Sequence, residues 1–183
     1  MMRWAYSLSF AIFCLLLSLF VLVSDPFFTQ EVLKLTSPPK SAGPTAQLFD
    51  YFFGLAPIPS VFNEREVSHL RDVRNLLWLS FFVLIFAFIL SFSGILAYGR
   101  VVVRNGFLIL LGAAILGLIV PFNSLFWYFH LVFFPQGNWI FPANSTLITF
   151  YPSDFFLMYS IAILVCALCF SLVLFFALRP CGE

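Results

Sequence analysis

The two histidines are the residues of this chain best suited to proton-transfer chemistry. His69 and His130 are the only histidines among its 183 residues. An imidazole has an unperturbed pKa of about 6.5, so it can take up or release a proton close to neutral pH. Each histidine lies just outside a hydrophobic stretch long enough to cross a membrane. If the chain threads the bilayer as its hydropathy indicates, both imidazoles reach the same face at the same depth, as in an acid–base site.

His69 is predicted to stand on a rigid helix with a carboxylate beside it. Asn63 can serve as the N-cap, and Glu66, three residues later, can complete a capping box. A helix that begins after this cap can continue without a break into the following apolar stretch. On that helix Arg65 lies four residues before His69 and Asp72 three residues after it, so the three side chains share a face. The spacing predicts His69 as a general base whose ring Asp72 orients.

A purely structural interpretation of these residues stays open. His69 can belong to a juxtamembrane helix whose charges face lipid headgroups, and His130 to an aromatic girdle at the membrane surface. The arginines before the second apolar stretch can bind a phosphate or carboxylate, or simply contact headgroups. The chain also contains 27 phenylalanines, many near the outer ends of the apolar stretches. They favour an interfacial belt, with an acyl-chain groove as the alternative.

The composition is that of a membrane protein. Hydrophobic residues make up 62% of the chain and charged residues 9%, whereas a soluble domain carries roughly 25% charged residues. A membrane-spanning helix needs about 20 apolar residues, and backbone groups in lipid must be hydrogen-bonded within the segment. We therefore expect an all-α membrane protein with four transmembrane helices. The stretches that qualify, none of which contains a charged residue or histidine, are residues 4–23, 76–98, 106–126 and 156–178.

The two segments on the outer side are predicted to form a small extracellular cap. They comprise residues 24–75 and 127–155, and the first contains an irregular Pro/Ser-rich stretch at residues 36–44. Short apolar, aromatic and β-branched pieces at residues 47–53 and 146–151 have strand character. The sequence thus predicts a single integral membrane domain, residues 1–183, whose cap contains some β structure.

The distribution of charge predicts the orientation in the membrane. Basic residues lie at both ends of the chain (Arg3 and Arg179) and in the connection predicted at residues 99–105, which contains Arg100 and Arg104. By the positive-inside rule these parts are cytoplasmic, which puts the histidines at the outer face. Arg65, Arg71 and Arg74 run against this rule, because they lie outside. The net charge of +1 gives no indication of nucleic-acid binding.

Two blocks around the histidines resemble the bacterial lipoprotein intramolecular transacylase family, commonly called Lit. The first is residues 62–73, which precede the second apolar stretch and contain His69. The second is residues 129–141 with His130, continuing to residues 147–152. The four-span plan is similar from end to end. The chain departs from the family pattern at Asn144 and Ser145, where an acidic residue is expected, so a role for an acid there is in doubt.

The resemblance implies a defined reaction at the outer face of a bacterial plasma membrane. The substrate is a diacylated lipoprotein, whose N-terminal cysteine carries a thioether-linked diacylglycerol. Its sn-2 acyl chain moves to the α-amino group of that cysteine, which gives a lyso-form lipoprotein. The family's two essential histidines correspond to His69 and His130, one as base and the other as acid. Asp72 is expected to assist, and the candidate substrate-binding residues in these blocks are Arg65, Phe129 and Trp139.

We further expect a monomer that works among membrane lipids without a cofactor. Ester-to-amide conversion is downhill, so neither ATP nor a metal is needed. The alternatives are a non-catalytic four-span adaptor or channel subunit, and a lipid acyltransferase with a serine nucleophile. The sequence contains no GxSxG elbow, HExxH motif or glycine-rich phosphate loop. A trapped acyl-enzyme would indicate the serine enzyme, and polar residues along the spans would indicate a channel.

Overall fold

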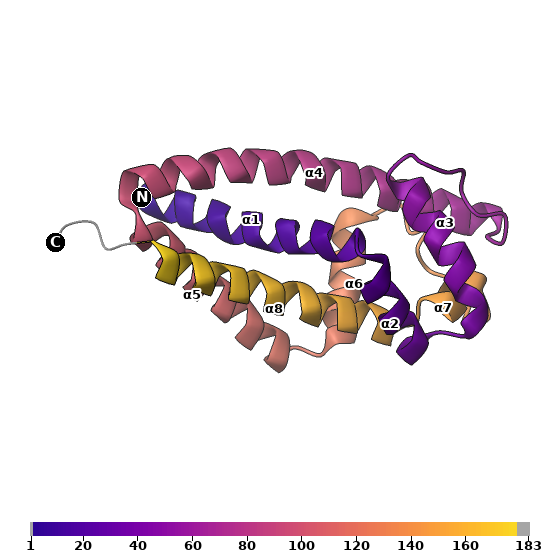
Figure 1. Cartoon of the computed structure of the whole chain (residues 1–183). Coiled ribbons are helices and arrows are strands. Elements are labelled where there is room, and N and C mark those ends of the chain that lie inside the picture. Colours follow the sequence, from indigo (N-terminus) through magenta and orange to yellow (C-terminus); the bar gives the residue numbers. More distant parts are fainter. Residues whose placement is uncertain (1, 179–183) are drawn as a thin grey trace. The chain divides into compact units, whose positions relative to one another are not determined.

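Helices joined by turns and two longer loops, after α3 and after α6, make up the computed structural model, which describes residues 2–178 (Figure 1). Four of the helices are long and apolar enough to cross a membrane, in agreement with the expected four spans: α1 (Met2–Val23), α4 (Glu64–Tyr98), α5 (Arg100–Ile119) and α8 (Ser153–Ala177). The remaining elements are α2 (Pro26–Thr36), the 3-10 turn η1 (Pro39–Ser41), α3 (Ala42–Phe52), α6 (Phe122–Phe133) and α7 (Thr146–Phe150). Arg179, one of the predicted cytoplasmic charges, lies outside the described residues.

The chain divides into two compact units. Unit 1 comprises Met1–Val21, Ser80–Val120 and Ile161–Glu183, and unit 2 comprises Leu22–Leu79 and Pro121–Ser160. Both α4 and α8 contribute residues to each unit. The two histidines belong to unit 2, and so do all the helices that are too short to span a membrane.

The core of unit 1 is formed where α1, α5 and α8 pack together. Its fully buried members include Phe10 and Cys14 of α1, Val102 and Leu110 of α5, and Ala167 of α8. α1 and α5 approach closely at a glycine of α5, Gly106. A Cβ there would lie 2.5 Å from a ring carbon of Phe10 and 3.1 Å from the backbone oxygen of Ser7. Small residues allow such close helix contacts inside membranes.

The helix that corresponds to the third span begins and ends earlier than the apolar stretch at residues 106–126. Residues 99–105 are not a connection, since α5 begins at Arg100 directly after Gly99. Gly99 makes the turn with φ 55, a conformation that glycine adopts without the steric penalty of a Cβ. At the other end α5 stops at Ile119, two residues before Pro121. Proline has no N–H and clashes with the preceding turn, so the following residues start a separate helix, α6.

The predicted β structure of the cap is wrong, because residues 2–178 contain no strand. Residues 47–52 lie in α3, and residues 146–150 form α7. The physical reason is the spacing of the apolar residues. Leu48, Tyr51 and Phe52 of α3 are buried on one helical face, as are Leu147 and Phe150 of α7. A short apolar run fits a strand and a helix equally well until its packing partners are known. The Pro/Ser-rich stretch is also partly helical, since it contains η1.

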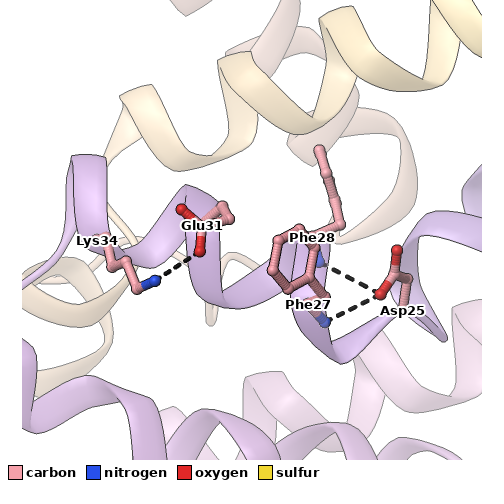
Figure 2. Close-up of polar contacts among 5 residues, drawn as sticks. All are labelled: Asp25, Phe27, Phe28, Glu31 and Lys34. Atoms are coloured by element: carbon pink, nitrogen blue, oxygen red, sulfur yellow. Dashed lines mark hydrogen bonds and ion pairs between the residues drawn. The ribbon is translucent and has the colours of Figure 1, made fainter.

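Side-chain hydrogen bonds fix the short helices of unit 2. Asp25 caps α2, as its Oδ1 accepts from the backbone N–H groups of Phe27 (2.9 Å) and Phe28 (3.3 Å), and Glu31 pairs with Lys34 further along the same helix (Figure 2). Two buried hydroxyl pairs connect distant segments. Thr45 of α3 bonds Tyr151 at 2.8 Å, and Thr29 of α2 bonds Tyr159 at the start of α8. These bonds hold α2 and α3 against residues 151–159.

Candidate active site

The helix that carries His69 begins with the predicted capping box. Asn63 Oδ1 accepts from the backbone N–H groups of Arg65 and Glu66, both at 3.0 Å. Glu66 Oε2 accepts in return from the N–H of Asn63 at 2.9 Å. α4 then runs without interruption from Glu64 through the apolar stretch to Tyr98. His69 therefore stands on a capped, continuous helix, and both of these predictions are confirmed.

Glu66 also joins α4 to α7. Its carboxylate is fully buried, and its second oxygen, Oε1, accepts from the N–H of Leu147 at 2.9 Å. Ser145 caps the same helix, since its Oγ accepts from the N–H of Ile148 at 3.2 Å. The acid expected shortly before Leu147 is absent from this sequence. In the structure a carboxylate from α4 reaches that point instead, and Ser145 supplies the local cap.

His130 lies near the end of α6 with one ring nitrogen engaged. Its Nδ1 is 2.7 Å from the carbonyl oxygen of Phe126, one turn earlier. A carbonyl oxygen only accepts, so this bond assigns the proton to Nδ1 and leaves Nε2 with the free lone pair. Aromatic rings surround the imidazole: its centroid is 4.2 Å from that of Phe126, 4.8 Å from Trp139 and 5.5 Å from Phe129.

The structure brings the two histidines together. Their ring centroids are 6.0 Å apart and the ring planes are inclined by 31°. Phe134 lies against both, at 4.8 Å from His69 and 5.4 Å from His130. Both imidazoles are buried, with 5% of His69 and 8% of His130 exposed. This pairing needs α4, α6 and the loop that follows α6, all of which contribute to it from within unit 2.

The expected direct contact between Asp72 and His69 is not formed. Asp72 Oδ2 instead accepts from Gln136 Nε2 at 2.8 Å and from Asn138 Nδ2 at 2.6 Å. His69 Nδ1 is buried without a hydrogen-bond partner among residues 2–178. Helical spacing does place Asp72 one turn after His69, as predicted. The loop after α6 then supplies two amide donors, and these occupy the carboxylate.

Burial governs the protonation of His130. It lowers the pKa of His130 below its ordinary value of 6.5, because the charged imidazolium loses its hydration in this aromatic setting. The hydrogen bond to the Phe126 carbonyl acts in the opposite direction and offsets part of the effect. His130 is therefore neutral at neutral pH and able to accept a proton at Nε2.

The candidate substrate-binding residues lie around the pair. Phe129 and Trp139 flank His130, as described above. The Arg65 guanidinium is 5.8 Å from the centroid of Phe141, whose ring is in turn 5.7 Å from His69. Of the two other arginines predicted on the outer side, Arg74 stacks over Tyr51 at 4.7 Å.

Sequence reasoning missed Phe134 and Asn138 of this site, and it also missed Gln136, which bonds Asp72 but neither histidine. The sequence feature that could have indicated them is the pair of amides, Gln136 and Asn138, on either side of one glycine within a run of aromatic residues. They were part of the block that resembles Lit, but no partner for them was visible in the sequence.

A separate cavity of about 320 Å³ lies between α2 and α3. Neither histidine lines it; its walls include Thr29, Leu33, Thr45, Phe49 and Phe53. Within residues 2–178, no three histidine, cysteine or acidic side chains lie close enough together to hold a metal ion.

Comparison with known proteins gives a consistent result. The family described as lipoprotein intramolecular transacylase Lit matches residues 4–156. The fold resembles the membrane-integral Lit of Bacillus cereus with a TM-score of 0.76 and 19% identity, over 96% of this chain and 92% of that one. A variant of that protein with a histidine replaced by arginine matches at a TM-score of 0.73 and 19% identity, covering 96% and 88%. No curated protein matches the sequence.

Proposed function

Since the chain belongs to the lipoprotein intramolecular transacylase family Lit, we propose that its buried histidine pair performs the acyl transfer of that family. The protein is thus an acyltransferase integral to the membrane. The adaptor, channel and serine-enzyme alternatives have no support. The observation that carries the proposal is the 6.0 Å separation of the His69 and His130 rings in a buried site.

The substrate is a diacylglyceryl lipoprotein. The α-amino group of its N-terminal cysteine attacks the carbonyl carbon of the sn-2 ester, a C–N bond forms, and the bond to the glyceryl oxygen breaks. Nucleophile and ester belong to one molecule, so correct positioning supplies much of the rate. The products are an amide at the cysteine and a free hydroxyl on the glycerol, which together make the lyso form.

The proton balance suits two imidazoles that start neutral. The amine has an unperturbed pKa of about 7.7–8.0 and arrives mostly as an ammonium. His130 accepts the first proton at Nε2, which frees the amine for attack. His69 accepts the second proton as the C–N bond forms. The imidazolium of His130 then protonates the departing glyceryl oxygen, and His69 releases its proton to solvent. His130 is taken as the first proton acceptor because the hydrogen bond of its Nδ1 to the Phe126 carbonyl oxygen leaves the Nε2 lone pair free.

The surrounding residues suit a lipid substrate. Phe129 and Trp139 offer apolar faces beside His130 for the acyl chain or glyceryl unit. Arg65, exposed on α4 near Phe141, is placed to contact a carbonyl oxygen or a headgroup phosphate. Both histidines come from one chain, which supports a monomeric enzyme.

The charge pattern supports an outward-facing site. Arg3, Arg100 and Arg104 favour the cytoplasmic side by the positive-inside rule. Both termini would then be cytoplasmic and the histidine pair would face the outer leaflet of a bacterial plasma membrane, where mature lipoproteins reside.

Mass spectrometry of a lipoprotein's N-terminal peptide, after co-expression with this chain in bacteria, tests the function. We expect lyso-form product from the wild type, and a loss of at least about 100-fold in the variants His69→Gln and His130→Gln, since each removes an acid–base group. The matched control is Gln47→Ala, an amide on α3 that bonds the Pro57 carbonyl oxygen. Absence of product from a folded wild type would overturn the function, and full activity in either histidine variant would remove that residue from the mechanism.

A further inference from the structure

We propose that Asn138 is a positioning residue that couples Asp72 to His69 and sets which nitrogen of His69 reacts. The proposal rests on the function proposed above and deepens it. It replaces the direct Asp72–His69 contact expected from the helical spacing with a three-residue relay.

Asn138 bonds Asp72 and lies close to Ser68, the residue before His69. Its amide nitrogen Nδ2 donates to Asp72 Oδ2 at 2.6 Å and lies 3.4 Å from Ser68 Oγ. Its amide oxygen Oδ1 is buried without a hydrogen-bond partner among the described residues, and the same is true of His69 Nδ1. The Asn138 side chain also interacts with the His69 imidazole. These two complementary buried atoms form no hydrogen bond with each other in this structure, and the proposed relay pairs them.

The direction of the relay follows from the chemistry of its ends. A carboxylate accepts only, so the NH₂ group of Asn138 must face Asp72, and the amide oxygen is the atom available to His69. An oxygen acceptor favours a proton on His69 Nδ1, which leaves Nε2 as the basic atom. His130 has the same arrangement through the carbonyl oxygen of Phe126. Both imidazoles would then present Nε2 to the substrate.

The loop is shaped to present Asn138. Gly137 has φ 73, and its N–H bonds the carbonyl oxygen of Phe134 at 3.1 Å. This tight turn allows Gln136 and Asn138, on either side of the glycine, to donate to the same oxygen of Asp72. Gln136 also donates to Asp72, but its side chain is exposed. It therefore provides a matched control for Asn138.

The charges around His69 make the relay testable by pH. The titratable groups that act on His69 are His130 of α6 and Asp72 of α4. Arg65 is the nearby cation, stacked over Phe141. An anionic acceptor placed against Nδ1 would favour the imidazolium and raise the pKa of the histidine.

The first experiment compares Asn138→Leu with Gln136→Leu in the full-length, membrane-embedded protein, using a synthetic diacylglyceryl lipopeptide as substrate. We expect Asn138→Leu to lower kcat by about 10- to 100-fold with little change in KM, the loss typical when a histidine's orienting partner is removed. Gln136→Leu should stay within about threefold of the wild type, because it leaves the Asn138–Asp72 bond in place. Thermal unfolding in detergent checks that both variants are folded.

The second experiment exchanges the two polar groups in the double variant Asp72→Asn/Asn138→Asp. The amide now donates to a carboxylate that accepts from His69. We expect this variant to recover most of the activity lost in Asn138→Leu, and the acidic limb of its kcat profile to lie at higher pH than in the wild type. A residue that only holds the loop in place would not move that limb.

Wild-type activity in a folded Asn138→Leu variant, or an unmoved limb in the double variant, would overturn the relay. Loss of activity in His69→Gln beside full activity in Asn138→Leu would reject the relay and leave the proposed function intact. A wild type that makes no lyso-form product would reject the function itself.

Discussion

The ring of His130 is fixed by a hydrogen bond, and its charged form is disfavoured by burial. Its Nδ1 is held by the carbonyl oxygen of Phe126, and its imidazole ring lies among the rings of Phe129, Phe134 and Trp139. The helix thus fixes the tautomer, while the aromatic enclosure disfavours the imidazolium. A general base should be unprotonated at the working pH, and this environment meets that requirement without a neighbouring carboxylate.

The lowered pKa of His130 predicts how stability depends on pH. The unfolded chain, with its ordinary value of 6.5, binds the proton more readily than the folded protein. The free energy of unfolding should therefore fall as the pH drops below this value and be insensitive to His130 above it. We expect a smaller loss of thermal stability on acidification in His130→Gln, measured in detergent micelles. Equal acid sensitivity in both proteins would contradict this prediction.

α4 is much longer than a membrane span requires. It has 35 residues, whereas about 20 suffice to cross the hydrocarbon core. The additional turns carry the capping box, His69 and Asp72. α6 is a separate short helix, because the preceding helix ends before Pro121 and a new helix begins at Phe122. His130 consequently lies on a short helix of its own rather than at the end of a span.

Glu66 is expected to be the main connection between α4 and α7. In Glu66→Gln, one of the two backbone N–H groups that the carboxylate satisfies would face an NH₂ group or lose its partner. A buried donor left unpaired costs about 1–3 kcal/mol, so this variant should unfold at lower temperature and lose activity as the loop before α7 loosens. Glu64→Gln, in the same first turn but exposed, is the control and should change stability by less than about 0.5 kcal/mol. Similar effects of the two substitutions would contradict the connection.

The core formed by the spanning helices and the histidine site lie in different units of the molecule. The buried core of unit 1 comes from the spanning helices, and the histidines, the relay and the cavity between α2 and α3 all belong to unit 2. Changes that loosen unit 1 should therefore affect folding before they affect the chemistry of the histidine pair. The tight contact at Gly106 offers a direct test of this separation.

Gly106→Ala should destabilise the protein, since the new Cβ would lie 2.5 Å from the fully buried Phe10 ring and 3.1 Å from the backbone oxygen of Ser7. Overpacking of this kind costs about 1–3 kcal/mol. Gly112→Ala is the matched control on the same helix, because nothing lies within 4 Å of its Cβ. Alanine should stabilise a helix there by about 0.5–1 kcal/mol. Thermal unfolding of both variants, together with kcat of the folded fraction, tests this prediction. A Gly106→Ala protein as stable as the wild type would contradict the close packing of α1 and α5 at this glycine.

The sequence by itself determined the features that depend on neighbours along the chain. Hydropathy specified four spanning helices, the Asn63–Glu66 capping box specified where α4 begins, and the resemblance around His69 and His130 identified the family. These signals are local, because capping and helical periodicity involve residues three or four positions apart.

Only the tertiary structure decided which distant groups meet. It turned the expected strands at residues 47–53 and 146–151 into helices, because their apolar faces had packing partners. In the folded protein, Asp72 also accepts hydrogen bonds from Gln136 and Asn138, more than 60 residues away, and not from His69. A carboxylate bonds the donors that folding brings nearest, and sequence spacing cannot reveal donors that arrive from another segment.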